Sequence, residues 1–413
     1  MSPPASVRPL DGLRVLDFTR VLAGPFATAL LADLGAEVIK IEPPHGDDYR
    51  AIGPMRNGQS ALFAVMNRNK KSVVLDLKNP TAVRLVLELA EKADVVIENF
   101  RPGVVDRLGI GPGVLRARSP RLVYVSLSGF GQNGPLANRP AYDIVVQAMS
   151  GLMEATGSPD GPPTLVGEAV SDVVSGLFAS WATLAALHQV AQTGQGQHVD
   201  LAMFDSTLSL LATSTARYLF TGQAPRRVGN RHPLSAPFGV YRARDGLFVL
   251  AVLNTKLFAA LAGALQRHEL ANDPRYATDE LRSSHEPELR AVIERWSAGQ
   301  TVEETVQRLE AAGVPAAPIW NIAQALESPQ AVARGLLPSI DDARLPGLRL
   351  PTQPAHFGGA APNRSERAPA LGEHTQAVLT ELLDCGLARL AELQAAGAFG
   401  GDRGARDPSG QSS

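Results

Sequence analysis

The sequence predicts an α/β protein with a Rossmann-like parallel sheet in a large domain and a smaller α+β domain after it. Short apolar runs alternate with helical patterns over residues 13–204, which is typical of a parallel sheet with helices on both faces. A stretch dense in Gly, Pro and Arg then interrupts this alternation. The length of 413 residues also exceeds what a single core usually holds.

The large domain is expected at residues 1–210. Its strands are predicted at residues 13–18, 36–42, 72–78, 94–100, 121–128 and 198–204. Pro25 opens a helical pattern that Gly35 ends, Asn79 and Pro80 begin another through about Lys92, and a further helix is expected at residues 205–220. Because ligands bind beyond the carboxyl ends of parallel strands, the loops after these strands should surround one crevice.

Residues 211–224 are expected to link the large domain to a small α+β domain at residues 225–327. That domain should contain a hairpin at residues 239–253 that turns at Asp245–Gly246, helices at residues 256–265, 286–297 and 301–312, and a strand at residues 313–319. Residues 328–394 are predicted to wrap a partner or another domain and to end in a helix at residues 373–393. The last stretch, residues 395–413, has the composition of a disordered tail.

Composition excludes several functional classes. A formal net charge of −2 gives no general attraction to nucleic acid or to an anionic membrane, so neither is an expected partner. The histidines and the single cysteine, Cys385, show no metal-ligand spacing, and one cysteine suits a reducing, cytoplasmic location. The N-terminus lacks the apolar segment of a signal peptide.

The glycines of SGFGQNGP, Gly129, Gly131 and Gly134, match the spacing of a dinucleotide fingerprint and follow a strand. The residues after them, beginning with Pro135, cannot open the helix that this fingerprint requires. We therefore reject a nicotinamide or flavin site. These glycines are expected to let the backbone pass close to a ligand or a neighbouring chain.

A long helical pattern at about residues 167–190 holds two acids one turn apart, Glu168 and Asp172. Its apolar residues predict a buried core helix rather than a membrane span, and they are Val170, Val174, Leu177, Trp181, Leu184 and Leu187. On the face of Asp172 the helix carries only the small residues Ser175, Gly176 and Ala179. Two interpretations stay open: space for a bulky substrate above a nucleophile, or close packing of another helix with the acids in solvent.

Several stretches together resemble the class III CoA-transferases, the family of carnitine, bile-acid and formyl-CoA transferases and of the α-methylacyl-CoA racemases. The stretches, in chain order, are LDGLRVLDFTRVLAGPFATALLADLGAEVIKIEPP, NRNKKSVVLDLK, DVVIENFRPGVVDRLG, SGFGQNGP, YDIVVQAMSGLM, TGQGQHVDLAMFD, GNRHP and LGEHT. The resemblance implies transfer of CoA from an acyl-CoA, such as succinyl-CoA or acetyl-CoA, to a carboxylic acid. It also implies an interlocked homodimer and no permanently bound cofactor.

The resemblance assigns the nucleophile to Asp172, which would carry mixed-anhydride and aspartyl-CoA thioester intermediates, and leaves Glu168 without a role. As a carboxylate at a helix start, Asp172 is expected to be ionised at neutral pH. Residues that match the CoA-contacting segments of the family are Val21, Leu22, Ala23, Leu75, Lys78, Asn99, Phe100, Arg101 and Arg107. Pro43 stands where some relatives carry a phosphate-binding arginine. Tyr142 is expected near the acyl group, with a buried hydroxyl bonded to backbone as the alternative.

The glycine-rich loop that covers the active site of formyl-CoA transferase is replaced by GNRHPLSAPFG. Its Arg231 and His232 could receive the second carboxylate of a dicarboxylic acid, or they could form a structural turn. Racemases place a histidine and a glutamate where this chain has Tyr142 and Asn254, which favours a transferase. A racemase and a non-catalytic CoA-binding protein are the alternative functions.

Overall fold

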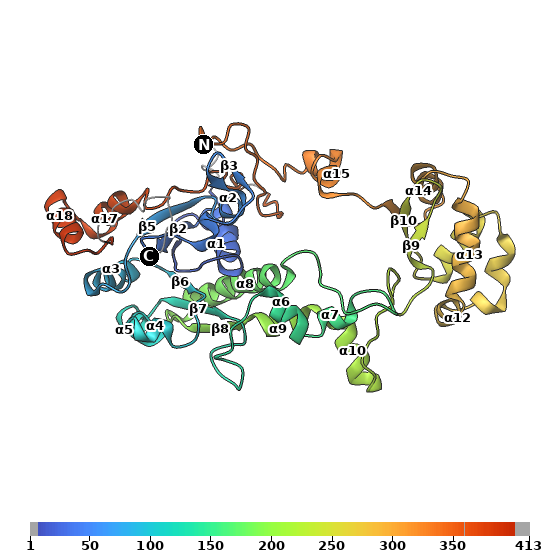
Figure 1. Cartoon of the computed structure of the whole chain (residues 1–413), viewed down its shortest axis with the longest axis horizontal. Coiled ribbons are helices and arrows are strands. Elements are labelled where there is room, and N and C mark those ends of the chain that lie inside the picture. Colours follow the sequence, from blue (N-terminus) through green and yellow to red (C-terminus); the bar gives the residue numbers. More distant parts are fainter. Residues whose placement is uncertain (1–6, 359, 401–413) are drawn as a thin grey trace, which may run out of the picture. The chain divides into compact units, whose positions relative to one another are not determined.

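The computed structural model describes residues 7–358 and 360–400, which form two compact units (Figure 1). The first comprises the chain up to Gly151, then Val166–Thr215, and the chain from Val332 onward. The second comprises Leu152–Leu165 and Ala216–Ala331. The predicted large domain ran through residues 152–165, whereas in the structure this segment packs with the second unit.

A sheet of six parallel strands forms the centre of the first unit, so the predicted α/β class is confirmed. The strands are β1 (Arg14–Asp17), β2 (Glu37–Glu42), β5 (Lys70–Val74), β6 (Val95–Glu98), β7 (Val123–Ser128) and β8 (His198–Ala202). Their spatial order is β5-β2-β1-β6-β7-β8. The strand order therefore reverses between β1 and β6, which is where doubly wound sheets bind ligands.

Side chains alternate between the two faces of the sheet, and each face has its own core. Leu16, Ile39 and Val73 lie on one face, against α3 (Pro80–Ala90), α5 (Pro112–Arg118) and α17 (Thr375–Leu383). Their neighbours in the chain, such as Val15 and Val38, lie on the other face with residues of α1 (Ala23–Asp33) and α8 (Val170–Thr193). Because nearly every side chain of the four inner strands β2, β1, β6 and β7 is buried, these strands read as largely apolar runs in the sequence.

The remaining elements of the first unit are mostly short. They are α1 (Ala23–Asp33), the 3-10 turn η1 (Asp48–Arg50), β3 (Met55–Arg56), β4 (Gln59–Ser60), α2 (Ala61–Met66), α4 (Val104–Arg107), α6 (Asp143–Met149), α8 (Val170–Thr193), α9 (Met203–Leu210) and α18 (Leu387–Ala395). Asn79 begins α3 as predicted, because its side chain accepts the amide of Thr81.

The second unit is built on an antiparallel sheet of three strands in the order β11-β10-β9. Its elements are α7 (Leu152–Ala155), β9 (Phe238–Arg242), β10 (Leu247–Ala251), α11 (Thr255–Ala264), η2 (His268–Asn272), η3 (Pro274–Tyr276), α12 (Asp279–Ser284), α13 (Glu286–Ser297), α14 (Val302–Ala311), β11 (Ala316–Pro318) and α15 (Ile322–Leu326), and α16 (Pro329–Ala333) crosses its end. The predicted hairpin, three helices and final strand are all present.

Three expected elements differ from the structure. The helix predicted at residues 205–220 is divided into α9 and α10 (Ala212–Thr221), so the expected linker at residues 211–224 is largely helical. The final helix is divided into α17 and α18 at Asp384, whose φ of 52° a helix does not allow. Residues 395–400 of the expected tail are ordered, because the carbonyl of Ala398 accepts the amide of Asp76. The rest of the tail, residues 401–413, lies outside the described residues.

Helix α8 buries the opposite face from the one that its sequence pattern predicted. Its buried residues are Ser171, Ser175, Gly176, Ala179, Thr183, Ala186 and Val190, whereas Leu177, Trp181 and Leu184 are exposed. Gly176 decides this packing, because a Cβ there would lie 2.6 Å from the carbonyl oxygen of Ala23 in α1. By length and composition alone, α8 could span a membrane.

Candidate active site

A cavity of about 520 Å³ opens at the reversal of strand order in the first unit. Its walls come from the chain after β1 (Arg20 to Ala23), after β6 (Asn99 to Pro102) and at the end of β7 (Ser128 and Gly129), and from the N-terminal turn of α8. Gly129 allows the backbone to pass the Ala141 side chain, since a Cβ would lie 2.3 Å from the Ala141 Cβ. The cavity thus lies where the sheet topology places a ligand.

Most of the predicted site residues line this single cavity. They are Val21, Leu22, Ala23, Asn99, Phe100, Arg101, Tyr142 and Asp172. Leu75 does not line it, because its side chain is fully buried in the core. Lys78 and Arg107 are exposed outside the cavity lining. Tyr142 is 72% exposed, so the alternative of a buried hydroxyl is wrong.

The structure separates the two acids of the long helix. Asp172 is half-buried in the first turn of α8 and lines the cavity, whereas Glu168 precedes the helix and is exposed. The space next to Asp172 does not come from the small residues on its face, because α1 packs onto that face. It comes from the loops that follow β1, β6 and β7. The expected use of the small residues as room for a thioester is therefore wrong, and the alternative of close helix packing holds for them.

The N-terminus of α8 is held by a carboxylate from another helix. Ala169, which caps α8, has no side chain that can accept a helix amide. Instead, Asp143 of α6 accepts the Ser171 amide at 2.7 Å through Oδ1 and the Gln147 side chain at 2.6 Å through Oδ2. Gln147 is fully buried and also donates to the Glu168 carbonyl at 3.2 Å. Asp143 thereby fixes the turn that carries Asp172.

The pKa of Asp172 is raised from 3.8 to about 7, first by burial and second by the negative charge of Asp143. The expectation that this carboxyl is fully ionised at neutral pH is therefore wrong for the free chain, because burial outweighs the helix dipole. A more basic carboxylate is also a stronger nucleophile once it is ionised. The same charge acts on Tyr49, whose pKa is raised by burial, then by Asp172, Asp47 and Asp143.

Three arginines surround the cavity: Arg20, Arg101 and Arg139. Arg20 forms a 3.8 Å ion pair with Asp48 and lies over the Phe100 ring at 5.8 Å. Arg101 and Arg139 are exposed, and no acid among the described residues forms an ion pair with either of them. The cavity can thus offer guanidinium groups to phosphates or carboxylates.

Sequence reasoning missed Arg20, Arg139, Tyr49 and Asp143 as residues of this site. Arg20 and Asp143 directly adjoin residues that were predicted, Val21 and Tyr142, so the loop boundaries could have indicated them. Arg20 and Tyr49 also lie in loops after predicted strands, which were expected around the crevice, whereas nothing in the local pattern around Arg139 distinguishes it from a surface residue.

Arg231 and His232 lie in the second unit and have structural partners there. Arg231 forms a 3.3 Å ion pair with Glu286, and the His232 ring stacks on Phe238. His232 Nδ1 accepts the amides of Leu234 and Ser235, so both side chains have a structural role in this turn. A role for Arg231 and His232 in substrate binding stays a prediction.

Comparison with known proteins identifies the chain. The model of CoA-transferase family III matches residues 10–375. The chain is 45% identical to the acetyl-CoA:oxalate CoA-transferase of Acetobacter aceti, covering 92% of this chain and 97% of that protein. It is 42% identical to the succinate–glutarate CoA-transferase of Agrobacterium fabrum, covering 91% and 96%. The chain belongs to CoA-transferase family III.

The fold comparison agrees with this membership. A crystal structure of a CAIB/BAIF family protein from Brucella suis matches 92% of this family III chain and 100% of its own, with a TM-score of 0.81 and 39% identity. The predicted resemblance and the predicted enzyme class, a CoA-transferase acting on CoA thioesters, are thus confirmed. No group of three or more His, Cys, Asp or Glu side chains suited to a metal occurs in the described part of this family III enzyme.

Proposed function

We propose that this enzyme transfers CoA from succinyl-CoA or acetyl-CoA to a dicarboxylic acid through covalent intermediates on Asp172. The observation that carries the proposal is the position of Asp172, a carboxylate with a raised pKa in a cavity surrounded by arginines. Glu168, the other acid of the predicted helical pattern, is exposed outside this cavity.

The proposed reaction begins when an Asp172 carboxylate oxygen attacks the thioester carbonyl. The C–S bond breaks, and CoA thiolate leaves behind a mixed anhydride of Asp172 and the donor acyl group. The thiolate then attacks the Asp172 carbonyl carbon, which releases the donor carboxylate and leaves an aspartyl-CoA thioester. An acceptor carboxylate repeats these two steps in reverse and regenerates Asp172. Each step conserves one activated acyl bond, so the cycle needs no redox group and no nucleotide.

The arginines fit this substrate, because CoA carries several phosphates that guanidinium groups bind well. Arg101 and Arg139, which are unpaired among the described residues, are proposed phosphate contacts. Backbone groups of Val21, Leu22 and Ala23 are proposed to hold the thioester arm of CoA beside Asp172, because they line the same cavity. Tyr142, exposed at the same cavity, is proposed to lie near the acyl group.

A dicarboxylate acceptor is proposed because relatives with more than 40% identity are named for oxalate and for succinate and glutarate. The test is a panel of mono- and dicarboxylates offered with succinyl-CoA and with acetyl-CoA, with formation of the new acyl-CoA followed by chromatography. We expect turnover with at least one dicarboxylate and a kcat/KM for it at least tenfold above that for the monocarboxylate of equal length. Equal turnover of the matched monocarboxylates would refute the dicarboxylate assignment.

We further propose that the enzyme is an interlocked homodimer in the cytoplasm. Large apolar side chains are exposed on α8 (Leu177 and Trp181) and on α10 (Leu219 and Phe220), and a second copy would cover them. The single cysteine, Cys385, is free and buried, which suits a reducing compartment. Light scattering of the purified chain should give twice the monomer mass of 43.7 kDa, and a monomer would refute the dimer.

A further inference from the structure

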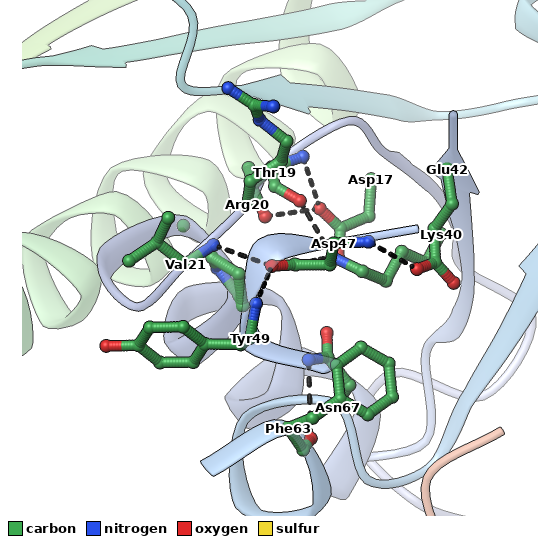
Figure 2. A network of polar contacts seen from close by, with 12 residues as sticks. Asp17, Thr19, Arg20, Val21, Lys40, Glu42, Asp47, Tyr49, Phe63 and Asn67 are labelled. Atoms are coloured by element: carbon green, nitrogen blue, oxygen red, sulfur yellow. Dashed lines mark hydrogen bonds and ion pairs between the residues drawn. The ribbon is translucent and has the colours of Figure 1, made fainter. Parts of the chain in front are cut away.

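A network of buried charged side chains contacts the loop at Thr19–Val21 (Figure 2), and Arg20 and Val21 of this loop line the cavity. Asp17, Lys40 and Asp47 are each no more than 2% exposed, and Lys70 is 4% exposed. Lys40 pairs with Asp47 at 2.8 Å and Lys70 pairs with Asp17 at 3.0 Å. Burying so much charge is costly, and well-packed apolar residues often stabilise a fold equally well.

The network holds the loop peptide by peptide. Asp17 Oδ1 accepts the Thr19 amide at 2.9 Å, and Lys40 Nζ donates to the Thr19 carbonyl at 2.7 Å. The Asn99 side chain both accepts the Arg20 amide and donates to the Arg20 carbonyl, each at 2.8 Å. Asp47 Oδ1 accepts the Val21 amide at 3.2 Å. The contacts thus reach three successive residues of the loop, of which Arg20 and Val21 line the cavity.

Val21 is the residue of this loop that most needs support. Its φ of 70° lies in the left-handed region, which is strongly disfavoured for a β-branched side chain. Such a conformation persists only where its surroundings over-determine it. The bond from Asp47 is the contact that fixes the Val21 amide in this orientation.

The same oxygen of Asp47 also holds a second wall of the cavity. Oδ1 accepts the Tyr49 amide at 3.0 Å and so begins the turn η1, which carries Asp48 and Tyr49. Asp48 lines the cavity, and Tyr49 is close enough to Asp172 for its pKa to be raised by that charge. One carboxylate oxygen therefore joins the two wall segments, and Lys40 fixes the other oxygen (Figure 2).

We propose that Asp47 is a positioning residue for CoA transfer: it holds Val21 and the Asp48–Tyr49 turn in the arrangement that places a CoA thioester at Asp172, and Lys40 holds Asp47. This inference rests on the proposed function, since it concerns the same cavity. Asp47 does not line the cavity, and its side chain is buried.

The test is a double-mutant cycle with Asp47→Ala and Val21→Gly, read by the affinity for free CoA and by the rate of the CoA adduct at Asp172. Glycine adopts a positive φ without strain, so Val21→Gly removes the need for the bond from Asp47. We expect Asp47→Ala alone to lower the adduct rate constant at subsaturating acyl-CoA by about 10- to 100-fold, because small misplacements in a reactive site cost this much. In the Asp47→Ala background, Val21→Gly should recover the rate about fivefold or more, so that the effects of the two substitutions do not multiply.

Asp47→Asn is the conservative variant, because its amide oxygen still accepts the Val21 and Tyr49 amides. It should stay within about fivefold of the wild type, since the geometry is kept while the charge is lost. Asp33→Asn is the matched control for fold stability, because Asp33 is fully buried and pairs with Arg68 at 2.6 Å without lining the cavity. It should lower the melting temperature without changing the CoA affinity.

The inference is overturned if the effects of Asp47→Ala and Val21→Gly simply multiply, or if Asp33→Asn lowers CoA affinity as much as Asp47→Ala. It is also overturned if Asp47→Ala melts lower yet binds and reacts with CoA as the wild type does. A wild-type enzyme that binds CoA but forms no adduct would instead refute the covalent mechanism. In that case the CoA affinities of the four proteins in the cycle still decide the role of Asp47.

Discussion

Replacing Asp172 by Asn should abolish transfer and, at the same time, stabilise the free enzyme at alkaline pH. The carboxyl pKa is raised from 3.8 to about 7 in the fold. Between these values the folded protein holds a proton at Asp172 that the unfolded chain has released. This group therefore stabilises the fold fully below its unfolded pKa, and the stabilisation is lost as the pH rises through about 7.

The magnitude follows from the same shift. One pKa unit corresponds to about 1.4 kcal/mol, so a shift of about three units amounts to about 4 kcal/mol. The Asp172 side chain still reaches solvent in the cavity, and screening reduces this figure to about 2 kcal/mol. The Asp172→Asn variant has no charge to bury at this position, so it does not lose this amount as the pH rises.

The assay is thermal unfolding of wild type and Asp172→Asn without CoA, at a pH well below and a pH well above 7. The difference in melting temperature, variant minus wild type, should be about 2–4 °C larger in the alkaline sample than in the acidic sample. Glu168→Gln is the matched control, because it removes a carboxylate that is exposed rather than buried. If the melting temperatures of Asp172→Asn and wild type differ by the same amount at both pH values, the raised pKa of Asp172 and its cause are refuted.

Three further predictions concern the cavity and the loop at residues 229–233. Asp143→Asn should shift the pH midpoint of CoA-adduct formation below that of the wild type, because it removes a charge that raises the pKa of Asp172. The amide oxygen of the variant still accepts the Ser171 amide. An unchanged pH profile would contradict this coupling. Arg101→Gln and Arg139→Gln should each raise KM for acyl-CoA by about 5- to 20-fold and weaken the salt dependence of KM. This range corresponds to about 1–2 kcal/mol for a charge-assisted hydrogen bond. A fall in kcat at unchanged KM would count against phosphate binding. Arg231→Ala should lower thermal stability, because Arg231 pairs with the buried Glu286. It should leave KM for dicarboxylates within about twofold of the wild-type value. A rise in KM for dicarboxylates but not for monocarboxylates would instead support the predicted role of Arg231 as a substrate contact.

The sheet could be predicted because its four inner strands are buried on both faces and appear as largely apolar runs with turn residues between them. The cavity could also be placed, since the topology of such a sheet determines which loops meet. The face of α8 was predicted wrongly because exposed Leu177 and Trp181 look like core residues in a sequence. The buried side of α8 is instead a row of small residues against which α1 packs. The close approach of Gly176 to Ala23 in α1 reveals this packing, and the sequence does not contain that distance.

Sequence pattern could identify two candidate acids but could not choose between them. The resemblance chose Asp172, and the structure gives the physical difference, burial for Asp172 and exposure for Glu168. The pKa of Asp172 could not be anticipated, because Asp143 belongs to another helix and its contact with Ser171 is tertiary. The same holds for Asp47 and Val21, which are 26 residues apart in the chain and joined by one hydrogen bond.

The central claim, covalent catalysis at Asp172, is tested most directly by intact-protein mass spectrometry after mixing with succinyl-CoA or acetyl-CoA. The wild type should gain the mass of CoA less one water, peptide mapping should place the adduct on Asp172, and an accepted carboxylate should remove it. Asp172→Asn should gain no adduct, and Glu168→Gln should behave as the wild type does. CoA exchange without any adduct, or an adduct that persists in Asp172→Asn, would contradict the account.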